Sequence, residues 1–453
     1  MSENKEARLG TERIGKLIFS MGMPVLLAQV INLLYNIVDR SYIGHIPEVG
    51  ATALTGVGLT VPILIIIGAL ASLACGGGAP LASIALGKGD REKAEKILGN
   101  AGALLIVFSI LVMVLFYVIE EPFLYFFGAS DATIGYASDY LNIYLLGTLF
   151  VQVTVGMNSF ITAQGRSGIA MVSVLIGAVL NIVLDPIFIF VFGMGVKGAA
   201  IATVISQGVS ALWVLSFLMG KKASLRLQIS KMRLERTTVK HMMALGISPF
   251  IMQSTEAMIS LVMNSGLQNF GGDLHVGSLT ILQSVMQMIT LPASGFGQGV
   301  MPVISYNYGA GNTERVRETF RKLLRVMLTM SATVSLAAIF LPRVFGNLFT
   351  NNAQMLDLVE KVLPIFVFGM IFFGLQMTCQ NMFIALGQAK ISLFIALLRK
   401  VILLIPLALI LPRVTGNVMG IYFAEPIADL LSVTTCGVLF AINFKKILEK
   451  SQR

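Results

Sequence analysis

Charged residues and cysteine are both scarce in this sequence. Lys, Arg, Asp and Glu make up 12% of its 453 residues, about half the share of an ordinary soluble domain. The three cysteines, Cys75, Cys379 and Cys436, lie far apart in apolar segments. They therefore provide neither a disulfide framework nor a metal site.

Histidine is equally rare, which limits the enzymatic chemistry that the chain can support. The histidines are His45, His241 and His275, each near the end of an apolar segment, and no HExxH pattern occurs. The chain also lacks the GxxxxGK[ST] phosphate loop of many ATP-driven pumps. We therefore expect neither an enzyme nor a primary pump.

Apolar residues, by contrast, are abundant along the whole chain. They make up 56% of it, and the mean hydropathy is +0.83. Apolar runs long enough to cross about 30 Å of hydrocarbon recur from end to end. The sequence predicts an all-α integral membrane protein with twelve spanning helices. We place them approximately at 14–43, 51–80, 95–119, 134–162, 168–192, 196–219, 240–269, 275–306, 318–341, 353–386, 390–411 and 417–443.

The basic residues lie in alternate connections between these predicted spans. They gather between Lys88 and Lys96, between Lys221 and Lys240, between Arg315 and Arg325, and at both termini, whereas Glu120 to Asp131 has none. This positive-inside pattern predicts a multi-pass protein of the cell membrane with both termini in the cytoplasm. The same placement argues against a nucleic-acid partner despite the net charge of +10, so the expected surroundings are the lipid bilayer.

The chain also repeats itself at a constant offset of 222 residues. The offset holds over several predicted helices, which predicts two six-helix lobes arranged as parallel repeats. We expect an N-terminal lobe at 1–219, a cytoplasmic linker at 220–239 and a C-terminal lobe at 240–453. Matching glycines are Gly87 and Gly309, Gly147 and Gly369, and Gly198 and Gly420.

An aspartate within the apolar segment from Gly177 to Phe190 is the strongest candidate for a functional residue. Asn181 and Asp185 share one helix face at a spacing of four. Pro186 removes an amide donor and displaces a carbonyl one turn earlier, which frees a backbone oxygen near the carboxylate. The pattern indicates an oxygen-lined site; the alternative is a kinked helix whose aspartate binds a neighbouring helix.

Two further polar residues are predicted to lie at the same depth. A count of about 1.5 Å per residue from the cytosolic side places Asp39 of the first helix in the outer half of the bilayer. Thr203 of the sixth helix reaches a similar level. Together with Asn181 and Asp185, these side chains predict one cluster built from three helices.

The second half carries charges at different positions. Glu256 lies on the seventh predicted helix, Arg399 and Lys400 lie in the middle of the eleventh, and the twelfth carries Glu425 and Asp429 at a spacing of four. Buried acids and bases are normally tolerated because they neutralise one another. We interpret this set as a structural ion-pair network, and a proton or substrate relay is the alternative.

Three motifs carry a resemblance to a known family. They are YNIVDRSYIG at Tyr35 to Gly44, NIVLDP at Asn181 to Pro186, and GAGN at Gly309 to Asn312. With the duplicated six-plus-six layout, they resemble the MATE family of multidrug and toxic compound extrusion transporters over residues 14–443. The resemblance implies two lobes in a V, a monomer, and export of organic, often cationic, compounds in exchange for H⁺ or Na⁺.

The resemblance also implies roles for individual residues. In members with an acidic first helix, the coupling ion binds an Asp of helix one, an Asn and an Asp of helix five and a Thr of helix six. These roles, including a possible Na⁺ site, fall on Asp39, Asn181, Asp185 and Thr203. Glu256 resembles an acid that another branch of the family uses. No cofactor other than the coupling ion is implied.

We expect the substrate to bind where the two lobes face each other. Methionine adapts to varied apolar ligands, and neighbouring amides supply hydrogen bonds. The candidate residues are Asn32, Asn36, Gln152, Met157, Gln283, Met286 and Gln287. A lipid-linked saccharide flippase of related architecture is the alternative function, with Arg399 and Lys400 as its only candidate cavity bases.

Overall fold

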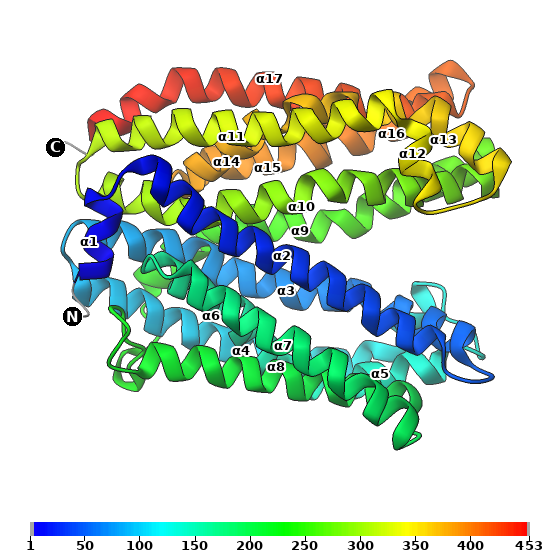
Figure 1. The fold of residues 1–453 in the computed structure, drawn as a ribbon, viewed down its shortest axis with the longest axis horizontal. Coiled ribbons are helices and arrows are strands. Elements are labelled where there is room, and N and C mark those ends of the chain that lie inside the picture. Colours follow the sequence, from blue (N-terminus) through cyan, green and yellow to red (C-terminus); the bar gives the residue numbers. More distant parts are fainter. Residues whose placement is uncertain (1–3, 451–453) are drawn as a thin grey trace.

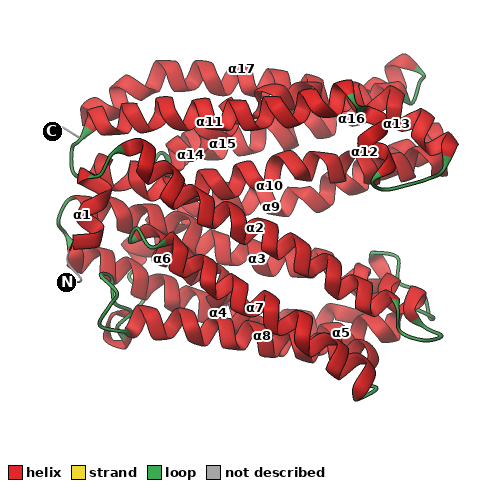
Figure 2. Ribbon diagram, in the orientation of Figure 1, coloured by secondary structure: helices red, strands yellow, loops and turns green. Residues whose placement is uncertain are grey.

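The protein is a bundle of long helices (Figure 1). The computed structural model describes residues 4–450, apart from the side chains at positions 4–6, 257, 273 and 450, and this part of the chain contains no strand (Figure 2). The first half comprises α1 (Asn4–Thr11), α2 (Ile14–Gly44), α3 (Gly50–Gly87), α4 (Arg91–Phe126), α5 (Ile134–Leu146), α6 (Thr148–Ala163), α7 (Ser167–Pro186), η1 (Ile187–Val191) and α8 (Gly195–Met219). The second half comprises η2 (Ile229–Lys231), α9 (Arg236–Gly271), α10 (Asp273–Gly309), α11 (Thr313–Phe340), α12 (Pro342–Asn347), α13 (Ala353–Phe366), η3 (Phe368–Phe372), α14 (Phe373–Ala385), α15 (Ala389–Leu397), η4 (Leu398–Leu404), α16 (Ile405–Thr415) and α17 (Met419–Lys450).

These helices confirm the predicted all-α membrane fold. Among residues 4–450, eleven helices are long and apolar enough to cross a bilayer, and the bent pair α5 and α6 forms the twelfth span. The helices fall into two groups, α2–α8 and α9–α17, which diverge towards the end that holds α5 and α13 (Figure 1). The groups are joined where α2 packs on α10, and where α3 packs on α9 and α10.

Two predicted spans are broken rather than continuous. The span predicted at 134–162 bends by 59° between α5 and α6, and the span predicted at 353–386 is interrupted by a 3₁₀ turn, η3. Glycine stands at both breaks: a Cβ at Gly147 would lie 2.6 Å from Val204, and one at Gly369 would overlap Asp429. The missing side chains let α8 and α17 approach these breaks closely, so the 222-residue repeat extends to the irregular turns.

The helix groups also meet through glycines at the end where α1 lies. A Cβ at Gly87 would overlap the carbonyl oxygen of Tyr306, and a Cβ at Gly309 would overlap that of Ile84. The two glycines and the two carbonyl residues are each related by the same 222-residue offset. The two groups therefore touch backbone to backbone in a nearly symmetric way.

Helix α2 packs against helices of both groups. Ile14, Leu17 and Met21, in its first part, lie in the apolar core that α9–α17 build, while α2 also packs along α7. Pro24 lies inside the helix, where it removes one backbone hydrogen bond. A shift of one group relative to the other must therefore change the contacts of α2 with α7 or with the second group.

The predicted linker, 220–239, lies against the first group of helices. Gln164 Oε1 accepts a hydrogen bond of 2.9 Å from the Ser224 amide, and Asn100 Oδ1 accepts one of 2.7 Å from the Glu235 amide. These side chains satisfy backbone donors that would otherwise be buried without partners. The linker is thus ordered, and α9 already begins inside it.

Candidate functional site

Asp39, Asn181, Asp185 and Thr203 lie together, and we call them the acidic cluster. Asn181 Nδ2 donates hydrogen bonds to Asp185 Oδ1 over 3.1 Å and to Thr203 Oγ1 over 3.3 Å. The carboxyl group of Asp39 lies within hydrogen-bonding reach of that of Asp185. Helices α2, α7 and α8 therefore meet at one polar point, as the depth count from the sequence predicts.

The local structure of α7 explains how Asn181 and Asp185 are positioned. The regular helix ends at Pro186, and a π-helical turn, η1, follows it. Proline cannot donate to the preceding turn, and wide turns of this kind often accompany functional sites. A Cβ at Gly198 would lie 2.6 Å from the carbonyl carbon of Phe188. Glycine at this position lets α8 approach η1 closely and brings Thr203 to the cluster.

The acidic cluster is buried, and no base among the described residues forms an ion pair with it. Asp185 and Asn181 are 0% and 2% exposed, and Asp39 is 8% exposed. No ion pair within residues 4–450 includes either aspartate. Among the described residues, Asp39 Oδ1, Asn181 Oδ1 and Asp185 Oδ2 also have no hydrogen-bond partner. Two buried carboxylates at such close range repel each other unless a proton or a cation lies between them.

The ligand chemistry of the cluster suits a proton or a hard cation. Its carboxylate, amide and hydroxyl oxygens are hard ligands, which bind protons or alkali and alkaline-earth ions rather than soft metals. In the part of the chain that the structure describes, no group of three or more His, Cys, Asp or Glu side chains could hold a metal ion. A proton or Na⁺ therefore fits the donor set.

Tyrosines that the sequence reasoning did not select surround the cluster. Tyr140 of α5 is 4% exposed, and its hydroxyl lies near the side chain of Thr203. Its ring stacks on Tyr144 with centroids 5.9 Å apart. Tyr35 precedes Asp39 by one helical turn and lies near both carboxylates. Helical spacing could have identified Tyr35, but Tyr140 comes from a helix with no acidic residue in its buried face.

The charges of the second half form a separate network around Arg399. Its guanidinium contacts Glu425 over 3.1 Å and Asp429 over 2.6 Å, and lies 5.5 Å from the ring centroid of Phe373. Glu425 and Asp429 are 3% and 1% exposed. This arrangement has the geometry of a buried ion-pair network, in which each acid has a basic partner.

Lys400 forms the other part of this second network. Its ammonium group binds the carboxylate of Glu256 and the carbonyl oxygen of Met252, the latter over 2.7 Å. The Lys400 side chain is 7% exposed and that of Glu256 is 60% exposed. Arg399 and Lys400 are adjacent in the π-helical η4, so one base faces α17 and the other faces α9. Both candidate cavity bases are therefore paired.

The residues proposed for the substrate surface fall into two groups. Asn32 and Asn36 of α2 and Gln283, Met286 and Gln287 of α10 are partly or fully exposed. Met157 is 1% exposed inside the apolar core of the first group of helices, and Gln152 is fully buried. The structure thus leaves the α2 and α10 residues accessible and does not bring Gln152 and Met157 together with them.

Comparisons with known proteins agree with this architecture. The model of the family described as MatE matches residues 24–187 and 249–410. "Multidrug export protein MepA" of Staphylococcus haemolyticus is 24% identical over 93% of this chain and 92% of its own length. The MepA protein of Staphylococcus saprophyticus is 25% identical over 97% of this chain and 96% of its own length.

Solved structures show the same fold. The crystal structure of a MATE protein in the bent conformation has a TM-score of 0.93 at 20% identity and covers 100% of both chains. The straight conformation has a TM-score of 0.90 at 20% identity and covers 98% of both chains. With the family match spanning both helix groups, these findings show that the chain belongs to the MatE family, the multidrug and toxic compound extrusion transporters, and is not an enzyme.

Proposed function

We propose that this protein is a secondary antiporter that exports organic compounds, many of them cationic, in exchange for H⁺ or Na⁺. The observation that carries the proposal is the pair of buried aspartates without a base, Asp39 and Asp185. Buried acids in spanning helices are costly and usually functional. Relatives that cover nearly the whole chain are named multidrug export proteins, which supports the substrate class.

The acidic cluster couples ion binding to helix packing. With a proton or Na⁺ bound, the two carboxylates lie close together at little electrostatic cost. Without the ion, repulsion favours separation of α2 from α7. Because the first part of α2 is packed in the core of the other helix group, a change in its contact with α7 alters the relation between the two groups.

Ion and substrate then act on one conformational equilibrium. A compound that binds better when the carboxylates are ionised lowers the affinity for the ion, and by linkage the ion lowers the affinity for the compound to the same extent. Two polar residues of α2, the exposed Asn36 and the partly exposed Asn32, lie about one and two turns before Asp39. This position places a substrate surface beside the ion site and supplies a physical route for the competition.

The arrangement of connections supports a cytoplasmic location for both termini. Helix α1, the end of α17 and the basic linker lie at the same end of the bundle (Figure 1). Arg91, Lys231 and Arg315 belong to this end, which follows the positive-inside pattern. We place this end in the cytoplasm and the diverging ends of α5 and α13 outside the cell, and we propose a monomer as the working unit.

The test is efflux of a fluorescent cationic dye from proteoliposomes, driven separately by a Na⁺ gradient and by a pH gradient. Efflux should follow one gradient in the wild type and disappear in Asp185→Asn. Asp139→Asn is the matched control, because Asp139 belongs to the same half but forms an exposed pair with Lys197 at 3.3 Å. Surface pairs of this kind contribute about 0–1 kcal/mol, so this variant should retain efflux.

Two outcomes would contradict the proposal. Undiminished, gradient-driven efflux in Asp185→Asn would remove the acidic cluster from coupling. Efflux in the wild type that follows neither gradient would favour the flippase alternative, although the two bases that it requires, Arg399 and Lys400, are both paired with acids.

A further inference from the structure

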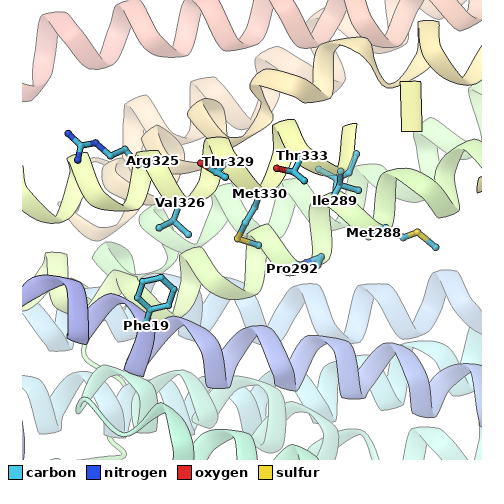
Figure 3. Close-up of a pocket in the computed structure, with 10 residues that line it drawn as sticks. Phe19, Met288, Ile289, Pro292, Arg325, Val326, Thr329, Met330 and Thr333 are labelled. Carbon is cyan, nitrogen blue, oxygen red and sulfur yellow. The ribbon is translucent and has the colours of Figure 1, made fainter. Parts of the chain in front are cut away.

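A groove outside the acidic cluster lies where α2, α10 and α11 meet (Figure 3). It has a volume of about 580 Å³ and lies on the outer side of the junction between the two helix groups. Its principal apolar walls are Phe19 of α2, Met288 and Pro292 of α10, and Met330 of α11. None of these residues belongs to the acidic cluster or to the network around Arg399.

The groove is open towards the hydrocarbon of the bilayer. Phe19 is 55% exposed and Met288 is 36% exposed, although both belong to helices that are long and apolar enough to span a membrane. Large apolar side chains that are exposed at such positions contact lipid chains. A lipid acyl chain is therefore the apolar molecule available to this groove.

One end of the groove carries positive charge. Arg325 lies at this end, and Val326, Thr329 and Met330 follow it along the groove (Figure 3). Lys322, one turn earlier on α11, lines an adjoining hollow of about 190 Å³ together with Arg325 and Phe19. No ion pair between described residues includes Arg325, whereas Lys322 pairs with Glu318 over 2.6 Å. Arg325 is thus a base that is free to bind an anion.

The depth of this base matches the headgroup region. Arg325 is the last charged residue of α11, and the fifteen residues from Val326 to Phe340 are uncharged, so this base lies at the edge of the apolar part of the helix. A long side chain at such a position extends towards the interface and keeps its charge in polar surroundings. The cytoplasmic leaflet is the one that carries anionic lipids.

We propose that this groove binds an anionic phospholipid, with its phosphate on Arg325 and one acyl chain along Phe19, Met288 and Met330. A guanidinium matches a phosphate through two parallel hydrogen bonds, and Lys322 adds a second positive charge nearby. The apolar wall alone would accept any lipid, so the charged end determines the preference for an anionic headgroup. The bound lipid contacts α2 and α11 together and stabilises their present spacing.

Photolabelling in nanodiscs tests the proposal. The protein is reconstituted in phosphatidylcholine with a minor fraction of phosphatidylglycerol whose acyl chain carries a diazirine, and adducts are mapped by peptide mass spectrometry. Labels should appear on peptides that contain Phe19, Met288 and Met330. Arg325→Gln should reduce labelling about tenfold, which corresponds to the loss of one charge-assisted contact of about 1.4 kcal/mol.

The controls separate charge, shape and protein damage. Arg321→Gln removes a charge from an exposed residue of the same helix that does not line the groove, and it should leave labelling unchanged. Thr333→Trp fills the apolar part and leaves both bases intact, so it should reduce labels at Phe19, Met288 and Met330 without affecting labels outside the groove. A phosphatidylcholine probe with the same diazirine should label the groove weakly in every variant.

Three results would overturn the proposal. The first is equal labelling by the two lipid probes, which would leave an ordinary lipid-facing surface. The second is unchanged labelling in Arg325→Gln. The third is full competition by soluble glycerol phosphate, which would assign the site to a free phosphate compound instead of a lipid. Dye efflux measured on the same samples distinguishes these results from a failure of the export proposal, since lipid binding does not require transport.

Discussion

The two halves of the protein bury acids in opposite ways. In the first half, Asp39 and Asp185 lie together with no ion-pair partner among the described residues. In the second half, Glu425 and Asp429 share the guanidinium of Arg399. A buried charge needs compensation in either case. The second half supplies its compensating charge from its own sequence, whereas in the proposed antiport the first half leaves that role to an ion that can leave.

The internal repeat shows how few sequence positions underlie this difference between the two halves. Counting 222 residues onward, Thr203 of the acidic cluster corresponds to Glu425, and Gly177 corresponds to Arg399. A Cβ at Gly177 would lie 2.6 Å from the hydroxyl of Ser210, so α7 and α8 have no room for a base there. The π-helical η4 contains Arg399 at the matching position. The two copies of one helix arrangement thus accommodate their buried acids in two different ways.

The largest effect should follow from breaking the network of the second half. Arg399→Met leaves two buried acids without their base, and we expect a loss of about 3–5 kcal/mol in unfolding free energy. Thermal unfolding in detergent measures it. Adding Glu425→Gln and Asp429→Asn to the same chain should restore most of the loss. A single variant as stable as the wild type would show that Arg399 does not compensate these acids.

The acidic cluster should respond differently to the same type of change. Asp185→Asn removes a repelling charge, so it should not lower the melting temperature in the absence of Na⁺. If Na⁺ is the coupling ion, the wild type should gain about 2.7 kcal/mol at 100 times the dissociation constant, and the variant should gain none. A Na⁺ shift of equal size in both proteins would contradict ion binding at Asp185. If Na⁺ stabilises neither protein and the pH gradient drives efflux, the coupling ion is a proton.

Helical periodicity and depth were sufficient to predict the acidic cluster. Asn181 and Asp185 share a face because of their spacing, and the residue count along each span placed Asp39 and Thr203 at their level. These quantities depend on single helices, whose geometry in a bilayer is constrained by length and apolarity. The twelve spans were predictable for the same reason.

Features that depend on packing between helices were not predictable. Tyr140 lies near Thr203 because α5 packs on α8, and no spacing within α5 signals this packing. Met157 is of a residue type that often contacts ligands, but here it is buried in an apolar core. Which face of its helix is buried depends on the helices that pack around it. The groove beside Arg325 requires the relative placement of α2 and α11, which no local pattern contains.

A smaller effect is expected at the edge of the acidic cluster. Tyr140→Phe removes a hydroxyl that lies within reach of Thr203 and leaves the stacked ring in place. The loss of one buried polar contact costs about 1 kcal/mol, so the apparent ion affinity measured by gradient-driven dye efflux should fall about fivefold. Tyr144→Phe is the matched control on the same helix. If Tyr140→Phe has no effect on ion affinity, the ion site does not extend to α5.

The smallest effect should come from the exposed end of the second network. Glu256→Gln retains an amide oxygen that accepts a hydrogen bond from Lys400, which also keeps its contact with the Met252 carbonyl. Because the Glu256 side chain is 60% exposed, solvent screens its charge, and we expect a loss of only about 0.5 kcal/mol in unfolding free energy. Ion-driven dye efflux should also be retained, because this acid, unlike Asp185, already has a base. Loss of efflux in a stably folded Glu256→Gln protein would instead make the second half a partner in coupling and remove the contrast between the two halves.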